Sequence, residues 1–365
     1  MKHKFIIDKQ SIRDFSPLFT IPSITKYVVF ILLFSYCFQV AGQSVNRFRI
    51  MFYNVENLFD TEKDSTINKD NYVAGGVLYW SEYRLQTKLS NIFKVMAAVG
   101  QGSLPEIVGF CEVENRNVLE MLLNKTPLKY HSYEIIHRDS RDSRGIDVAM
   151  LYRKDRYWPL EEQFLAVKFT SSNHHTRDIL YSKGLLPNKD TLHIFINHWP
   201  SKFGGAMATR PLRDDAARTL RQVTDSIQKI DPQAYIVITG DFNTNPDDEP
   251  IVKTLGAAFF NDATNAQFVN LTTAIYPSKY PGTLKFQGNW DCIDQFIVSK
   301  SLLENLKGNI ITSKDLVHIG HFDFLLEDDE TYLGKKPKRT YIGYKYNNGY
   351  SDHLPIYLDL LMNDF

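Results

Sequence analysis

Short stretches in which hydrophobic and polar residues alternate recur along the chain, and this period of two is typical of strands with one buried face. The first stretch, residues 47–52, alternates arginine or methionine with phenylalanine or isoleucine and leads to Asn54 on its buried face. Other segments are continuous apolar runs rich in valine and isoleucine, as in fully buried strands. Together these patterns predict further strands at residues 107–113, 133–137, 147–152, 192–196, 235–238, 292–298 and 356–360.

A helical period appears between these strands. In the segment 85–99, leucine, isoleucine, methionine and valine fall on one face, while Arg84, Lys88 and Asn91 occupy the other. We therefore expect a helix there that buries its apolar side and exposes Lys88. A second helix is predicted at 212–227 and a short one at 118–123. Strands and helices thus alternate in two comparable halves, which indicates the α/β class.

The composition permits one large domain. The chain has 365 residues, of which 43% are hydrophobic, and this is enough for a sizeable core. Basic and acidic residues number 42 each, and without residues 1–42 there remain 37 basic and 40 acidic residues. A broad basic face for gripping nucleic acid is therefore excluded, and any phosphate binding must be local.

The N-terminal 42 residues have the pattern of a signal peptide. Residues 27–38 form an apolar run broken only by Ser35; the run follows Lys26 and ends near the small residues Ala41 and Gly42. It is too short to cross a bilayer, which needs about 20 apolar residues, so we rank cleavage above permanent anchoring. We expect an exported protein, periplasmic or secreted, without a membrane span after cleavage, and a single domain at residues 43–365.

Of the three cysteines, Cys37 lies in the predicted leader. Cys111 and Cys292 sit inside apolar, strand-like runs, which favours buried free thiols over a disulfide. A cysteine-based zinc site has no support in the sequence. In the strand 107–113, we expect Glu112 to share a face with the apolar residues before it, and Cys111 to point to the opposite side.

Polar residues stand where the predicted strands begin or end, and a charged group on a buried strand face needs a partner, which a metal ion or an arginine would supply. Asp241 and Asn243 point the same way if their strand continues, although an Asx turn is the simpler alternative. For His198, a hydrogen-bonded structural role is the competing interpretation. The six strand ends carry Asn54, Glu112, His198, Asp241 with Asn243, Asp294, and Asp352 with His353.

In this order, these motifs resemble the endonuclease/exonuclease/phosphatase superfamily, metal-dependent phosphohydrolases that include deoxyribonuclease I and apurinic endonucleases. The resemblance covers residues 47–360, and Gly-Asp-Phe-Asn at 240–243 with Ser-Asp-His-Leu-Pro at 351–355 is highly specific for it. The segments 53–60, 111–115 and 197–201 are similar to its bacterial, often exported, nuclease-like branch. The resemblance implies a deoxyribonuclease I-like α/β fold, a four-layer sandwich of two packed mixed sheets flanked by helices.

The resemblance also implies roles for the strand-end residues. Phosphodiester hydrolysis needs a metal ion to neutralise the phosphate, a base to activate water and an acid for the leaving oxygen. Glu112, with Asn54, suits Mg²⁺ or Mn²⁺, which favour oxygen ligands, and Glu114 is a weaker alternative. Asp241 is the expected base, and Asn243 would hold the water or a phosphate oxygen.

The remaining residues would contact the phosphate or support the others. His353 would contact the phosphate, with Asp294 oriented against its other nitrogen. His198 would be a second phosphate contact or the general acid, oriented by Asp147, and Asp352 would support the metal or the base. Further candidates for phosphate contacts are Arg144, Arg210 and Arg218.

The superfamily includes nucleases, inositol-phosphate phosphatases and sphingomyelinases, so the motifs leave the substrate open. We favour a monomeric nuclease with nucleic acid as substrate; a phosphatase on inositol, sugar or lipid phosphates and a non-catalytic binding protein are the alternatives. Trp199 and the tyrosines at 341, 344, 346 and 350 would offer stacking surfaces, unless Trp199 only covers the core. Lys202 and the basic residues at 335–339 would supply positive charge, unless the acidic run 327–330 neutralises them.

Overall fold

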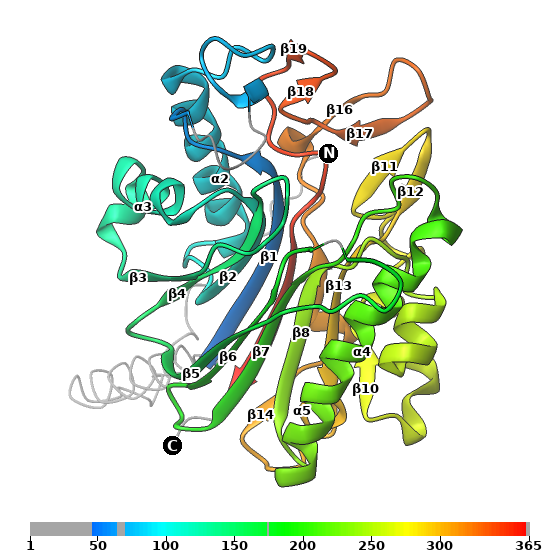
Figure 1. Ribbon diagram of the computed structural model, residues 1–365. Helices are drawn as coiled ribbons and strands as arrows, with labels where there is room; N and C mark the ends of the chain where they lie inside the picture. Colours follow the sequence, from blue (N-terminus) through cyan, green and yellow to red (C-terminus); the bar gives the residue numbers. More distant parts are fainter. Residues whose placement is uncertain (1–45, 64–69, 174, 363–365) are drawn as a thin grey trace, which may run out of the picture. The chain divides into compact units, whose positions relative to one another are not determined.

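The computed structural model describes residues 46–63, 70–173 and 175–362 (Figure 1). The predicted leader, residues 1–42, lies outside the described residues, so its cleavage stays a prediction. Among the residues that the structure describes, no helix is long and apolar enough to cross a membrane.

In the described part of the chain there are two seven-stranded sheets, and the first of them contains both the first and the last described strand. β1 (Asn46–Leu58) pairs parallel with β2 (Ile107–Val113) and antiparallel with β20 (Ile356–Met362). The other members are β4 (Asp147–Arg153) and β3 (Tyr133–His137) beyond β2, and β14 (Ile310–Ile311) and β15 (Val317–Ile319) on β20.

The second sheet is built around another parallel pair, β7 (Thr191–His198) and β8 (Tyr235–Asp241), with β13 (Asp294–Ser299) antiparallel to β8. Its order is β5-β6-β7-β8-β13-β10-β9. The outer strands are β5 (Trp158–Leu165), β6 (Ile179–Leu185), β10 (Phe268–Asn270) and β9 (Ala257–Phe259).

Helices cover the outer face of each sheet. α2 (Glu82–Gly100) and α3 (Arg116–Lys125) lie beside the first sheet, and the long α4 (Ala206–Ile230) lies beside the second (Figure 1). α2 begins where the Ser81 side chain accepts a hydrogen bond from the Arg84 N–H, so its first turn is capped. The four-layer α/β sandwich expected from the sequence is confirmed.

Strand alternation decides which side chains lie between the sheets. Along β8, Tyr235 and Val237 belong to the cluster shared by both sheets, whereas Ile236 and Ile238 pack with the α4 side. Gly109 of β2 marks a close approach of the sheets, because a Cβ there would lie 2.6 Å from the Ile196 side chain. The same alternation holds at the ends of the strands. The inner-face side chains at these ends therefore lie at one edge of the sandwich.

Most predicted elements are present, with three differences. Lys88 was expected on the exposed face of its helix, but it is buried, and its amine donates to Thr340 Oγ1 and the Tyr350 carbonyl. Residues 153–191, for which no element was predicted, contain β5 and β6. The C-terminal third also contains a four-residue helix and three small hairpins: α5 (Lys300–Leu303), β11 (Leu284–Phe286) with β12 (Asn289–Asp291), β16 (Leu326–Asp328) with β17 (Lys335–Pro337), and β18 (Tyr341–Ile342) with β19 (Lys345–Tyr346).

Candidate active site

The carboxyl ends of the two parallel strand pairs bring the predicted polar residues to one edge of the sandwich. Asn54 lies opposite Cys111 in the β1–β2 register, and His198 lies opposite Asp241 in the β7–β8 register. Asp294 begins β13 and is the register partner of Asp241, because these two strands are antiparallel. Side chains from five separate strands therefore meet at this edge.

Asp241 is the central group of this edge. Its Oδ2 accepts a hydrogen bond from Asn54 Nδ2 at 3.0 Å and lies 3.7 Å from His198 Nε2 and 3.8 Å from His353 Nε2. Its Oδ1 accepts the Asn243 N–H at 2.9 Å. Burial raises the pKa of Asp241 to about 7, against the lowering effect of His353, so this carboxyl can exchange a proton near neutral pH.

His353 is held by a second carboxylate, as predicted. Its Nδ1 lies 2.8 Å from Asp294 Oδ2, which leaves Nε2 facing Asp241. The loop before β20 is fixed by Ser351, whose hydroxyl donates to the Asn54 carbonyl and accepts the His353 N–H. Burial alone lowers the pKa of His353, but the Asp294 carboxylate, with that of Asp241, raises it well above its usual value. The two carboxylates therefore favour the protonated form of His353.

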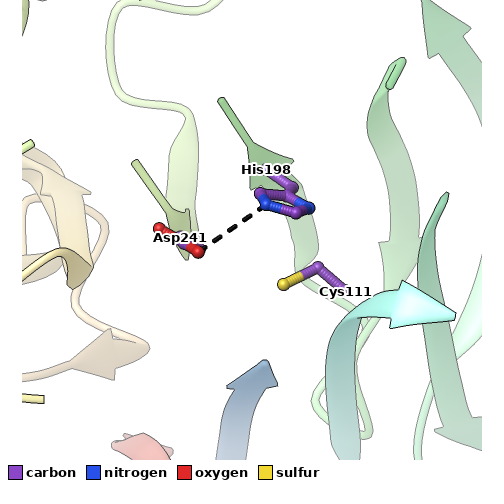
Figure 2. A group of neighbouring side chains, drawn as sticks. All are labelled: Cys111, His198 and Asp241. Carbon is purple, nitrogen blue, oxygen red and sulfur yellow. Dashed lines mark ion pairs between the residues drawn. The ribbon is translucent and has the colours of Figure 1, made fainter. Parts of the chain in front are cut away.

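His198 has the opposite character. Burial, with the nearby guanidinium groups of Arg177 and Arg144, lowers its pKa well below the usual value, so the imidazole is neutral. Its Nδ1 has no hydrogen-bond partner among the described residues. The competing interpretation of a hydrogen-bonded structural histidine does not fit this nitrogen. Figure 2 shows His198 beside Asp241, with the Cys111 side chain directed at the same space.

Asn243 adopts the simpler of the two predicted conformations. The strand ends at Asp241, and Asn243 has a φ of 49°, so the pair forms a turn in which the Asn243 N–H bonds the Asp241 carboxylate. The Asn243 side chain donates to the Trp199 carbonyl at 3.0 Å. Asn243 thus orients Asp241, rather than sharing a ligand with it along a continued strand.

Glu112 stands at a bulge that strand alternation could not predict. Its φ is 62°, and the β2–β4 register shifts between Cys111 and Val113. Cys111 reaches the space between the sheets, whereas Glu112 Oε2 accepts the Asn57 N–H at 3.0 Å and lies 3.8 Å from Arg144 Nη2. From the sequence, Glu112 and Asn54 were expected to bind one metal ion together. In the structure, Asn54 Nδ2 donates to Asp241, and Asn54 Oδ1 accepts the Glu56 N–H.

Two acidic candidates serve other groups. Asp147 was expected to orient His198, but its carboxylate accepts the Ser140 N–H and lies 3.7 Å from His137 Nε2. Asp147 is the first residue of β4 and pairs with Val113 at the end of β2. Its side chain lies near His137, the last residue of β3. Glu114 is buried and accepts the Asp60 N–H at 2.7 Å, which makes it a support for the loop after β1.

Of the arginine candidates, only Arg144 reaches the site. Arg218 and Arg210 lie on α4, on the outer face of the second sheet, and form ion pairs with Asp215 and Glu249, respectively. Arg177 was not identified from the sequence, although its Nη2 donates to the Trp199 carbonyl at 2.9 Å and its charge acts on His198. An isolated arginine in the segment before β6 gives no periodic signal.

Asp352 does not contact Asp241 but belongs to an ion-pair chain beside it. Arg339 Nε donates to Glu56 Oε1 at 2.9 Å, and Arg339 Nη2 donates to Asp352 Oδ2 at 3.1 Å. Burial, with Asp352, raises the pKa of Glu56 to about 7. Burial also lowers the pKa of Lys88, to about 8. The ion pairs of Arg339 therefore connect the loop before His353 to the end of β1.

The stacking and charge predictions are corrected in part. Trp199 is only 1% exposed and packs edge-on against Phe242, so it covers the core and offers no stacking surface. Lys335 pairs with Asp328 at 2.7 Å, and Lys336 lies 3.9 Å from Glu327 and from Asp329, so the acidic run neutralises this part of the basic run. Of the four tyrosines, Tyr341 and Tyr350 are buried, Tyr346 is partly buried, and Tyr344 is 74% exposed.

The donor set fits a hard divalent cation. Only one oxygen of Glu112 is hydrogen-bonded within the described part of the chain, and Asp294 Oδ1 is buried there without a partner. Burial raises the pKa of Asp241, and a nearby cation would lower that pKa again because it stabilises the carboxylate. Carboxylate and amide oxygens are the ligands that such ions prefer.

Comparison with solved structures finds the same fold at low sequence identity. A D. rerio TDP2 structure has a TM-score of 0.52 at 15% identity, and the match covers 86% of this chain and 99% of that chain. A mannosyl-6-phosphatase of Bacteroides thetaiotaomicron has a TM-score of 0.53 at 15% identity, with 86% and 100% covered. The search of curated proteins gave no match.

The comparison with protein families covers a similar part of the chain. The model described as "Endonuclease/Exonuclease/phosphatase family" matches residues 49–362, which includes every strand of the two large sheets described above except the start of β1. Its members are hydrolytic phosphoesterases that generally use a divalent metal ion. Because the match covers far more than half of the sequence, this chain belongs to the endonuclease/exonuclease/phosphatase family.

Proposed function

We propose that the protein is a metal-dependent phosphodiester hydrolase that cleaves nucleic acid by in-line attack of water. The observation that carries the proposal is the Asp241 carboxylate, which is fixed by Asn54 and lies within 4 Å of a neutral and a protonated histidine. A base whose pKa lies near neutral pH, with a cationic donor beside it, suits the hydrolysis of a charged ester.

Each residue then has one task. Asp241 accepts the proton of the attacking water, while the Asn54 amide and the Asn243 N–H hold its two oxygens. His353 donates from Nε2 to a phosphate oxygen, and Asp294 fixes its ring and its charge. His198, with its neutral ring, makes a second polar contact to the phosphate.

Glu112 would hold one Mg²⁺ or Mn²⁺ ion, whereas Asn54, whose amide bonds Asp241 and whose oxygen accepts the Glu56 N–H, supports the base. The ion would neutralise charge on the phosphate when bound. Arg144 Nη2 lies 3.8 Å from Glu112 Oε2, so this guanidinium would add a further positive charge beside the ion.

Nucleic acid is the substrate that we favour. One structural relative, TDP2 of D. rerio, is described as complexed with a single strand DNA product. A phosphatase for sugar phosphates is the second candidate, since a mannosyl-6-phosphatase has the same fold and the basic run at 335–336 is neutralised by acidic residues.

The deciding experiment compares ester classes under one condition. Purified protein with Mg²⁺ is incubated with single-stranded DNA, duplex DNA, RNA, a small diester such as bis(p-nitrophenyl) phosphate, and mannose 6-phosphate. We expect cleavage of the polynucleotides and of the diester. Hydrolysis of the monoester alone would replace the nuclease proposal by the phosphatase one, and EDTA-resistant activity would contradict the metal requirement.

We also propose that the protein is exported. The apolar run at 27–38 after Lys26 and the small residues that follow it support removal of the leader. N-terminal sequencing of native protein should read from close to Gln43. A native chain that begins at Met1 would contradict export by cleavage.

A further inference from the structure

A thiol, an imidazole and a carboxylate meet between the two sheets, and the reaction proposed above leaves the thiol without a task. Cys111 comes from β2, whereas His198 and Asp241 end the neighbouring strands β7 and β8. Figure 2 shows the three side chains directed at one space, and their donor atoms lie within 4.8 Å of one another. All three residues are buried, with exposed fractions of 0%, 4% and 2%.

Two of these three side chains have unused binding capacity. Cys111 is a free cysteine, and its sulfur makes no hydrogen bond to another described residue. His198 Nδ1 is buried in the described structure without a partner. An imidazole nitrogen without a hydrogen-bond partner can bind a metal ion. Asp241 adds the negative charge that a cation requires.

We propose that Cys111, His198 and Asp241 form a site for zinc-class metal ions, with one sulfur, one nitrogen and one oxygen donor and a water molecule as fourth ligand. Tetrahedral zinc has ligand distances of about 2.0–2.3 Å, so its ligand atoms lie about 3.5 Å apart. Contraction from 4.8 Å needs movements of about 1 Å, which side-chain torsions provide. Binding forms a metal–sulfur bond and releases the thiol proton to solvent.

The donor types separate this site from that of the catalytic cation. Thiolate and imidazole favour zinc, whereas Mg²⁺ selects oxygen ligands and would avoid Cys111. The neighbouring group of Asp241, Asp294 and His353 is a poorer zinc site, because His353 Nδ1 already bonds Asp294 and no thiol is present. No zinc site was predicted from the sequence, because Cys111 lies on β2, far along the chain from His198 and Asp241 on β7 and β8.

Occupation of this site would switch the enzyme off. Zinc bound to Asp241 and His198 removes the water-activating carboxylate and a phosphate contact together. This inhibition rests on the proposed function, whereas the binding of the metal does not. The ion would also join β2 of one sheet to β7 and β8 of the other, so it should raise the temperature of unfolding.

Cobalt(II) absorption tests the binding without any assay of activity, since a thiolate ligand gives cobalt an intense near-ultraviolet charge-transfer band. The full-length protein, its Cys111→Ser and Cys111→Ala variants, and Cys292→Ser are titrated with Co²⁺ and then with Zn²⁺. Cys292 is the matched control, because it is also a buried free cysteine but belongs to none of the metal-ligand groups in the described residues.

We expect the band in the wild type and in Cys292→Ser, its loss in both Cys111 variants, and its displacement by Zn²⁺. Zinc should raise the unfolding temperature of the wild type, and the Zn²⁺ concentration for half-inhibition should rise about tenfold or more in folded Cys111→Ser. Absence of the band in the wild type, or its persistence in Cys111→Ser, would overturn the site. A zinc-binding protein that hydrolyses no phosphoester would instead refute only the proposed function.

Discussion

Asp241 faces two histidines whose pKa values move in opposite directions. The Asp294 carboxylate raises the pKa of His353 against the effect of burial. Burial and the positive charges of Arg177 and Arg144 lower the pKa of His198. Two rings of one residue type thus present a cation and a neutral group to the same carboxylate. Environment, rather than residue type, assigns the roles.

Replacement of Asp241 by asparagine should abolish most of the activity. The amide keeps the size of the side chain but accepts no proton, so turnover should fall by about 10²-fold or more. Asp247→Asn, an exposed acid in the following loop, is the control and should retain wild-type rates. The measurement is the steady-state rate on a small diester, with folding checked by circular dichroism. Near-normal turnover of folded Asp241→Asn would remove Asp241 as the base.

Asp294→Asn should change the pH profile as well as the rate. The Asp294 carboxylate raises the pKa of His353; without it, burial dominates and the pKa falls. If the protonated ring contacts the phosphate, the alkaline limb of kcat/KM should move to lower pH by about one unit or more. Asp291→Asn is the control, because that carboxylate faces Lys202 and Asn245 instead. An unmoved alkaline limb would show that the protonated form of His353 is not required.

The bulge in β2 shows what a strand pattern can and cannot predict. Residues 107–113 and 133–137 were predicted with the bounds that the structure has, because apolar runs in buried strands are read directly from the sequence. The side of the sheet to which the Glu112 side chain points was not predicted, because the sequence does not indicate a positive φ at a glutamate. β5 was missed because it is a largely exposed strand at the edge of its sheet without alternation.

Long-range partners account for the other differences. Lys88 has the sequence position of an exposed helix residue, but Thr340 and Tyr350, far along the chain, accept its amine in the interior. The convergence of Asn54, Asp241 and Asp294 was predictable, because strand ends and family motifs mark them. The positions of Arg177 and Cys111 near His198 could not be predicted, because they depend on how one sheet packs on the other.

Glu112→Gln should raise the Mg²⁺ concentration needed for half-maximal activity by about tenfold or more, because a carboxylate ligand loses its charge. Glu114→Gln distinguishes the two candidate ligands. Glu114 is buried and accepts the Asp60 N–H, so its loss should lower thermal stability more than metal affinity. Mg²⁺ titrations of activity and thermal unfolding measure the two effects. The reverse pattern would exchange the roles of these residues.

The contact between the two sheets should be sensitive to added volume. A Cβ at Gly109 would lie 2.6 Å from Ile196 Cδ1 and 3.2 Å from Phe52 Cδ2. Gly109→Val should therefore lower the free energy of unfolding by about 1–3 kcal/mol. Gly75→Ala is the control, since nothing lies within 4 Å of its added methyl group. Equal urea midpoints for the two variants would mean that the sheets separate freely at this point.

The charge balance of the chain limits how it can hold a polynucleotide. Basic and acidic residues number 42 each, and Lys335 and Lys336, the first residues of the basic run, lie against acidic partners. Arg177 is buried and pairs with Asp142 at 3.0 Å, so the local positive charge near the site comes from few groups, chiefly Arg144.

Binding of single-stranded DNA should therefore weaken only gently with salt. Each phosphate contact contributes about −0.7 to the slope of log K against log salt concentration, so two or three contacts give a slope of about −2. Fluorescence anisotropy with inactive Asp241→Asn measures this slope. Arg144→Ala should reduce its magnitude by about 0.7, whereas the double variant Lys335→Ser with Lys336→Ser should leave it unchanged. A slope steeper than about −5, or one that the lysine variant flattens, would mean that a broad basic surface binds the strand after all.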